Sequence, residues 1–177
     1  MLKHLHMTAR QWKTVLKWAL YSLLFLVTLV AQDVILAKHP IFGIKLTVVP
    51  LLIVCVCIRE GPESGGLFAV LTSVFWCLSG TDYGNLSVAI LPVCAILSAV
   101  LCRAVLTVRF VPTFLCCLAA SLIHESVIFA LKMLLASVLA RYYVSVVLPG
   151  VGLSLLALPL LYVLTKAISR TGGRHEL

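Results

Sequence analysis

The chain has few charged residues, and acidic ones are the scarcest. Only six of its 177 residues are Asp or Glu, and all charged residues together make up 11% of the sequence. A soluble domain of this length has too high a surface-to-volume ratio to bury a sequence that is 62% hydrophobic. The shortage of charge therefore excludes an ordinary soluble protein and indicates an integral membrane protein.

The motifs that mark common enzymes and metal sites are also absent from the sequence. It contains no Gly-rich phosphate loop, no nucleophile elbow and no zinc-protease motif. Its seven cysteines include no zinc-type Cys-x-x-Cys pair, and all of them lie in apolar stretches, where they act as small hydrophobic residues. We therefore expect no enzymatic activity and no bound metal or other cofactor.

Six apolar segments fill most of the chain, with short polar or charged breaks between them. Each is expected to be a membrane-spanning helix, because a hydrocarbon core about 30 Å thick needs roughly 20 apolar helical residues, and a helix satisfies its own backbone. The expected spans are Trp18–Ala37, Ile44–Ile58, Gly66–Ser79, Leu86–Cys102, Phe110–Leu131 and Tyr143–Thr165. The expected architecture is an all-α, six-helix membrane bundle at 18–166, between a basic segment at 1–17 and a tail at 167–177.

The distribution of basic residues predicts the orientation of this bundle. Ten of the fourteen Lys and Arg residues fall on the same side of the expected membrane as the N-terminus, and four fall on the other side. The positive-inside rule then places both termini in the cytoplasm. Topology and attraction to anionic headgroups account for the net charge of +8, so we expect no nucleic-acid partner.

One stripe of small residues marks a surface for close helix packing. Gly65, Ala69, Ser73 and Cys77 recur every four residues along the third span and therefore share one helix face. Small side chains let the backbone of another helix approach closely. The approaching helix belongs either to this chain or to a partner, and the spacing leaves both alternatives open.

A few polar residues lie inside the expected spans. Glu125 shares a face of the fifth span with Cys117 and Ser121, and His124 lies on the adjacent row. Ionisable groups in a membrane are costly and usually face the bundle interior or a water-filled cavity. Gln32, near the end of the first span, is a third candidate for such an intramembrane polar site. The alternative is that Glu125 is a buried, hydrogen-bonded packing residue.

Two further carboxylates, Glu60 and Glu63, lie in the turn between the second and third spans. Pro62 suits the first position of a helix, and Glu63 beside it favours a helix N-terminus. We interpret this segment as a solvated cytoplasmic turn that starts a helix. Contact with a cytoplasmic partner is the alternative.

Several sequence patterns follow the order of these spans. Gln32 ends the first span, and an extended link leads to Pro50 at the start of a hydrophobic run. A Gly-rich turn over 61–66 precedes the third span, and the turn LSGTDYG at 78–84 follows it. Together with the six spans, these patterns resemble the MreD family of rod shape-determining membrane proteins of bacteria.

The resemblance extends to the fifth span and fails at one place in the third. His124 and Glu125 fall where many members of the family carry a polar or acidic residue. An aspartate that typically precedes the turn at 78–84 is missing here, since Trp76 or Cys77 occupies its place.

The resemblance implies a non-enzymatic scaffold in the machinery of cell elongation and peptidoglycan synthesis, located in the bacterial cytoplasmic membrane. It implies association with an MreC-like single-span protein. Through that protein, it implies contact with the MreB filament, a RodA-like glycosyltransferase and a class B penicillin-binding protein. The family is also similar in fold to the S subunits of energy-coupling-factor vitamin transporters, so a substrate-binding S subunit is the alternative function.

Overall fold

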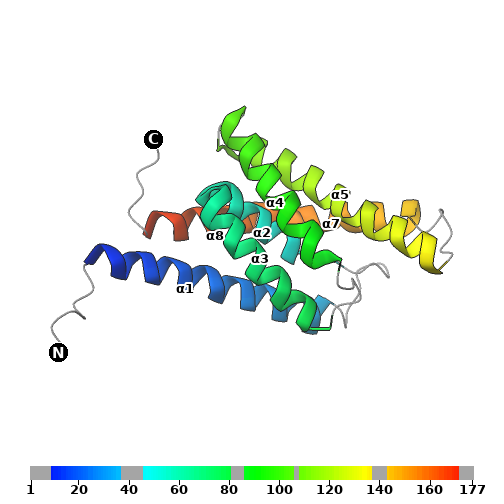
Figure 1. Ribbon diagram of the computed structural model, residues 1–177, viewed down its shortest axis with the longest axis horizontal. Coiled ribbons are helices and arrows are strands. Elements are labelled where there is room, and N and C mark those ends of the chain that lie inside the picture. The colour runs from blue at the N-terminus through cyan, green and yellow to red at the C-terminus, as the bar shows by residue number, and fades with distance from the viewer. Residues whose placement is uncertain (1–8, 37–45, 81–85, 106–107, 137–142, 172–177) are drawn as a thin grey trace.

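The computed structural model describes residues 9–36, 46–80, 86–105, 108–136 and 143–171, which form a bundle of helices (Figure 1). Helices account for 93% of these residues and no strand occurs among them, which confirms the all-α prediction. The elements are α1 (Ala9–Val30), η1 (Ala31–Leu36), α2 (Val49–Glu60), α3 (Pro62–Leu78), α4 (Ser87–Ala104), α5 (Phe110–Ala136), η2 (Tyr143–Val147), α7 (Leu148–Ser154), η3 (Leu155–Ala157) and α8 (Leu158–Thr171).

Four stretches of these helices are long and apolar enough to cross a membrane. They are Gln11–Val34, Ser87–Ala104, Phe110–Leu134 and Tyr143–Thr171. Their length and composition are compatible with a multi-pass membrane protein. The remaining two helices are shorter, since α3 has 17 residues and α2 has 12. At 1.5 Å per residue, α2 is only about 18 Å long, well short of the hydrocarbon core.

The short helix α2 lies inside the bundle. Every one of its residues except Arg59 is buried, and α1, α3, α4, α5 and α8 all contact it. Figure 1 accordingly shows α2 in the middle of the other helices. A helix that is apolar all round, as α2 is, suits a position that is covered on every side. The outer surface of the bundle is therefore supplied by the other helices.

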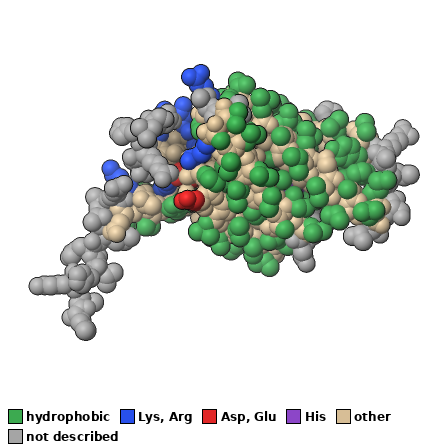
Figure 2. All heavy atoms as spheres, turned by 45° about the horizontal axis from the view of Figure 1, so that its top comes forward, with side chains coloured by type: hydrophobic (Ala, Val, Ile, Leu, Met, Phe, Trp, Pro, Cys, Tyr) green, Lys and Arg blue, Asp and Glu red, His purple; other side chains and the backbone are tan. Residues whose placement is uncertain are grey.

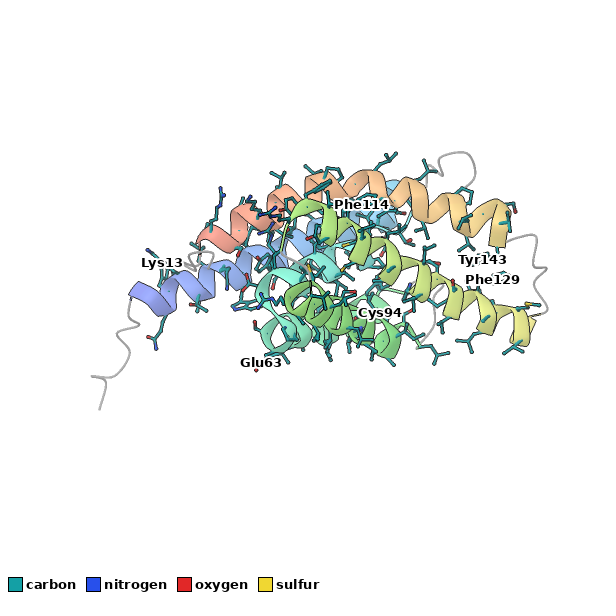
Figure 3. All side chains as sticks on the ribbon, turned by 90° about the horizontal axis from the view of Figure 1, so that it is seen from above. Lys13, Glu63, Cys94, Phe114, Phe129 and Tyr143 are labelled. Carbon is teal, nitrogen blue, oxygen red and sulfur yellow. The ribbon has the colours of Figure 1, made fainter. Side chains whose placement is uncertain are left out.

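The two ends of the bundle differ in charge. Figure 2 shows Lys and Arg side chains gathered at one end and hydrophobic side chains over most of the rest of that face. We call this the basic end. Here Lys17 of α1 pairs with Glu60 at the end of α2, Arg103 of α4 donates to the Arg59 carbonyl, and α8 contacts α1 at Thr165, next to Lys166. The opposite, far end carries η1, the end of α3 and η2. Figure 3 shows Lys13 and Glu63 toward the basic end, with Phe129 and Tyr143 toward the far end.

The helix boundaries differ from the expected ones at several points. The second helix begins at Val49 with Pro50 in its first turn, where a missing N–H costs no intrahelical hydrogen bond. The first and last helices extend beyond the segment boundaries expected at 17 and 167, because α1 begins at Ala9 and α8 ends at Thr171. The link at 37–45, including parts of the first two expected spans, lies outside the described residues.

Candidate intramembrane polar site

A cluster of polar side chains surrounds the buried N-terminus of α2 at the far end of the bundle. The cluster draws on η1, α5 and α7, and on residues 47–49 at the start of α2. A helix N-terminus has backbone N–H groups without intrahelical partners and carries a partial positive charge. Burying it requires acceptors from elsewhere in the chain. The α2 N-cap residue, Val48, provides no side-chain cap of its own.

Gln32 supplies the missing acceptor from another helix. Its Oε1 accepts hydrogen bonds from the backbone N–H of Val48 at 2.8 Å and of Val49 at 3.0 Å. The next residue, Pro50, has no N–H to satisfy. Gln32 is itself buried on η1, a π-helical continuation of α1. Gln32 therefore caps α2 in place of a local Ser, Thr or Asp.

Glu125 approaches the same helix start from α5. Its Oε1 lies 3.4 Å from the Thr47 hydroxyl, which donates to it, and 3.6 Å from Nδ1 of His124. The Glu125 side chain is 12% exposed and the His124 side chain is fully buried. The His124 ring stacks on the indole of Trp76 in α3, with centroids 6.1 Å apart. A carboxylate beside the positive end of α2 is favourable for the helix dipole.

Two further hydrogen bonds join this cluster to α7 and α3. The Thr47 backbone N–H donates to Oγ of Ser154 at 3.0 Å, and that hydroxyl donates to the Gly150 carbonyl. On the other side, Oγ of Ser79 donates to Asp33 at 3.3 Å. The network therefore ties η1, α3, α5 and α7 around the first residues of α2.

The three residues predicted as an intramembrane polar site, Gln32, His124 and Glu125, thus lie around one structural feature. The structure brings Gln32 to residues 48 and 49, and it brings Glu125 to residue 47. The sequence contains no signal that predicts these contacts, since residues 47–49 are Thr-Val-Val and resemble only the start of an apolar run. What the cluster can do chemically is to accept and donate hydrogen bonds inside the bundle. No group of three or more metal-ligating side chains occurs among the described residues.

The small-residue stripe on α3 is used within the chain. Gly65, Ala69 and Ser73 are buried, whereas Cys77 is partly exposed. A Cβ built on Gly65 would lie 2.6 Å from Cα of Cys57, so the backbones of α3 and α2 are in close contact there. The buried part of the stripe therefore packs against the bundle's own helices and is not open to a helix from another chain.

The interpretation of the turn at 59–66 as solvated is wrong for Glu60. This carboxylate is buried at the basic end, where Oε2 lies 2.5 Å from Nζ of Lys17 and Oε1 accepts a hydrogen bond from the Tyr21 hydroxyl at 3.0 Å. The Tyr21 hydroxyl also lies 3.3 Å from the Thr165 carbonyl oxygen, to which it can donate. Glu63, in contrast, is exposed, as expected.

The ion pair between Lys17 and Glu60 was not predicted from the sequence. Lys17 was explained as one of the basic residues that flank the first span and set the orientation in the membrane, so no partner was sought for it. One other signal was present: Lys17 and Tyr21 are four residues apart and so share a helix face. A cation and a phenol on one face of an otherwise apolar helix predict a buried acceptor. The identity of that acceptor, 43 residues away, required the fold.

Replacing Gln32 by Leu is expected to destabilise the protein more than replacing it by Glu. Leu removes the acceptor of two buried N–H groups, at a cost of about 1–3 kcal/mol for leaving such a donor unsatisfied. Glu keeps an acceptor oxygen and adds negative charge at the positive end of α2. The measurement is the thermal unfolding of both variants in detergent. Equal melting temperatures for the two would contradict the capping role.

Glu125→Lys is expected to lower membrane abundance more than Glu125→Gln. An ammonium would be placed beside the partial positive charge at the start of α2 and would have to be accommodated inside the bundle. The amide of Gln keeps an acceptor for the Thr47 hydroxyl. Quantitative immunoblots of membrane fractions test this. If both variants accumulate equally, the side chain at 125 is directed to lipid or solvent.

Comparisons of the chain with family models, with curated proteins and with solved structures find no match. Any functional proposal therefore depends on the sequence patterns and on the geometry described above.

Proposed function

We propose that the chain is a non-enzymatic membrane scaffold of the bacterial cell-elongation complex, which binds an MreC-like single-span protein. The observation that carries this proposal is that Gln32 and Glu125 make their hydrogen bonds within the protein itself. Side chains that would face a substrate in an enzyme, or a ligand in a transporter, bind the chain's own residues 47–49 instead. The sequence resemblance to the MreD family supports the same function.

The exposed surface suits helix–helix contact in a membrane. Large apolar side chains of α3 point away from the bundle, among them Leu67, Leu71 and Phe75. A partner helix within the bilayer would meet this kind of surface, because helix association there depends on van der Waals packing. The wider complex in this proposal includes the MreB filament, a RodA-like glycosyltransferase and a class B penicillin-binding protein, reached through the MreC-like protein.

Co-purification in detergent with an MreC-like single-span protein from the same organism tests the scaffold function. We expect a stable complex, and we expect depletion of the chain in a rod-shaped host to give rounded cells. Failure to associate, together with normal rods after depletion, would contradict the proposal.

The proposed topology counts six crossings, with both termini in the cytoplasm and the basic end of the bundle at the cytoplasmic face. Two of the six are the shorter helices, α3 and the interior helix α2, which runs from the far end, where Gln32 caps it, to Glu60 at the basic end. The support for this topology is the excess of Lys and Arg on one side, together with the collection of cations at one end (Figure 2). Reporter fusions after Arg174 and at Asp82 are expected to report cytoplasm and periplasm, respectively. A periplasmic signal after Arg174 would contradict this orientation.

A second candidate function is the S subunit of a vitamin transporter. One observation favours it: α2 is a short interior helix whose N-terminus lies among polar groups, and transporters often bind ligands at such helix ends. Calorimetry with purified protein and individual vitamins distinguishes the two functions. Tight vitamin binding without association with the single-span partner would favour the transporter subunit.

A further inference from the structure

An apolar groove lies between α4 and α5, on the outside of the bundle. Its volume is about 460 Å³, and it is lined on α4 by residues between Ala89 and Leu101 and on α5 by residues between Cys116 and Ile123. Figure 3 labels Cys94 and Phe114 on these two helices. Ala89, Leu97, Ala119 and Ile123 are exposed side chains along the groove, so it opens to the surroundings of the bundle.

The length and volume of the groove show whether a helix or a lipid acyl chain can fit into it. From Ala89 to Leu101 the helix rises about 18 Å, slightly more than half of a hydrocarbon core about 30 Å thick. A helix of that length and about 10 Å in diameter fills roughly 1,400 Å³. A hydrocarbon chain of the same length, about 4–5 Å thick by carbon contact distances, fills roughly 300 Å³. The groove therefore accommodates an acyl chain and not an inserted helix.

The charge at one end of the groove complements an anionic headgroup. Arg109 is exposed and directly precedes α5, where its carbonyl accepts a hydrogen bond from the Thr113 N–H. Arg109, Cys116 and Ile123 are seven residues apart, about two turns each, so Arg109 extends the groove-lining face of α5 toward the basic end. Its side chain makes no hydrogen bond or ion pair with another described residue.

The neighbouring cation, Arg103, has a different role. Its Nε donates to the Ile58 carbonyl at 3.1 Å, and a second guanidinium nitrogen donates to the Arg59 carbonyl. Arg103 therefore caps the C-terminus of α2, where a positive charge is favourable. It adds positive potential at this end of α4, and residues 87–115 contain no acidic residue.

We propose that the groove between α4 and α5 binds one anionic phospholipid, with an acyl chain along the groove and its phosphate at Arg109. The inference is independent of the scaffold function, because it uses only the outer surface of two helices. One basic residue near an anionic lipid surface contributes about a fivefold change in binding.

Native mass spectrometry of the full-length protein in detergent tests this, with phosphatidylglycerol and phosphatidylcholine of equal chain length as probes. We expect one phosphatidylglycerol to bind in preference to phosphatidylcholine. Arg109→Gln should weaken phosphatidylglycerol binding about fivefold and phosphatidylcholine binding less, because the choline cation already compensates the phosphate charge of phosphatidylcholine. The matched control is Arg170→Gln, which removes an exposed cation from α8.

Substitutions that fill the groove with a larger side chain test whether the acyl chain of the lipid lies there. Ala119→Phe should reduce binding of both lipids, whereas Ala19→Phe, at an exposed alanine on α1, should not. Ala89→Phe, on the α4 side, replaces Ala119→Phe if that variant does not fold. Unchanged binding in the groove variants, equal effects of Arg109→Gln and Arg170→Gln, or equal affinity for the two lipids would overturn the proposal. The proposal would also be overturned if the protein were a dimer that Ala119→Phe converts to a monomer, because a second copy of the protein would then occupy the groove.

Discussion

Replacing Glu60 by Gln is expected to destabilise the protein by about 3–5 kcal/mol, the usual cost of leaving one member of a buried ion pair without the other. In the folded protein the Glu60 carboxylate lies 2.5 Å from the Lys17 ammonium, and their side chains are 2% and 10% exposed. The neutral amide of Gln is similar in size but cannot compensate the buried charge of Lys17. The variant should therefore lose the ionic contact that Lys17, in the third turn of α1, makes with the end of α2.

Thermal unfolding of the detergent-solubilised protein measures this effect. Glu63→Gln is the matched control, because Glu63 is only three residues further along the chain, in the first turn of α3, and is exposed. The double variant Lys17→Met/Glu60→Met should recover most of the lost stability, since replacing both charges by apolar groups of similar size is often nearly neutral. If Glu60→Gln and Glu63→Gln melt at the same temperature, the ion pair contributes nothing to the stability of the bundle.

Replacing Gly65 by Ala is expected to destabilise the protein by about 1–3 kcal/mol, the usual cost of overpacking. The new methyl group would lie 2.6 Å from Cα and 3.0 Å from the carbonyl oxygen of Cys57. These are backbone atoms of the central helix, so relief of the clash requires α3 to move away from α2. This penalty outweighs the gain of about 1 kcal/mol that Ala normally brings to a helix interior. Gly65→Leu should be worse still.

The same substitution at Gly152 provides the control. No atom lies within 4 Å of a Cβ built on Gly152 in α7, so Gly152→Ala retains the helix-propensity gain without a clash. In the same unfolding assay, Gly→Ala is therefore expected to lower the stability of the protein at position 65 and to raise it at position 152. A stabilising effect of Gly65→Ala would show that α3 does not approach α2 as closely as described.

Much of the helical layout was predictable from the sequence. The apolar runs interrupted by charged or Gly-rich breaks predicted helices that correspond to α1, α3, α4 and α5, because a long apolar run forms a helix wherever it is buried or placed in lipid. The spacing of Gly65, Ala69 and Ser73 also indicated a close helix contact, and these three residues are buried. The spacing alone did not reveal that the contacting helix is α2.

The position of α2 was not predictable from its own residues. Apolar residues on all sides suit equally a helix in lipid and a helix enclosed by protein, so the sequence placed Ile44–Ile58 with the other spans. The enclosing helices leave no face of α2 for lipid, and a buried helix start then needs acceptors from distant segments. For this reason Gln32 caps residues that lie 16 and 17 positions away.

The sequence by itself determined an all-helical, strongly apolar chain with its cations unevenly distributed, because hydropathy and charge are properties of local composition. Only the tertiary structure decided the partners of its few polar groups. Lys17 meets Glu60, and Glu125 meets Thr47, across 43 and 78 residues. Such pairs depend on which helices lie side by side, and the packing of nearly uniform apolar faces is not encoded in any short segment.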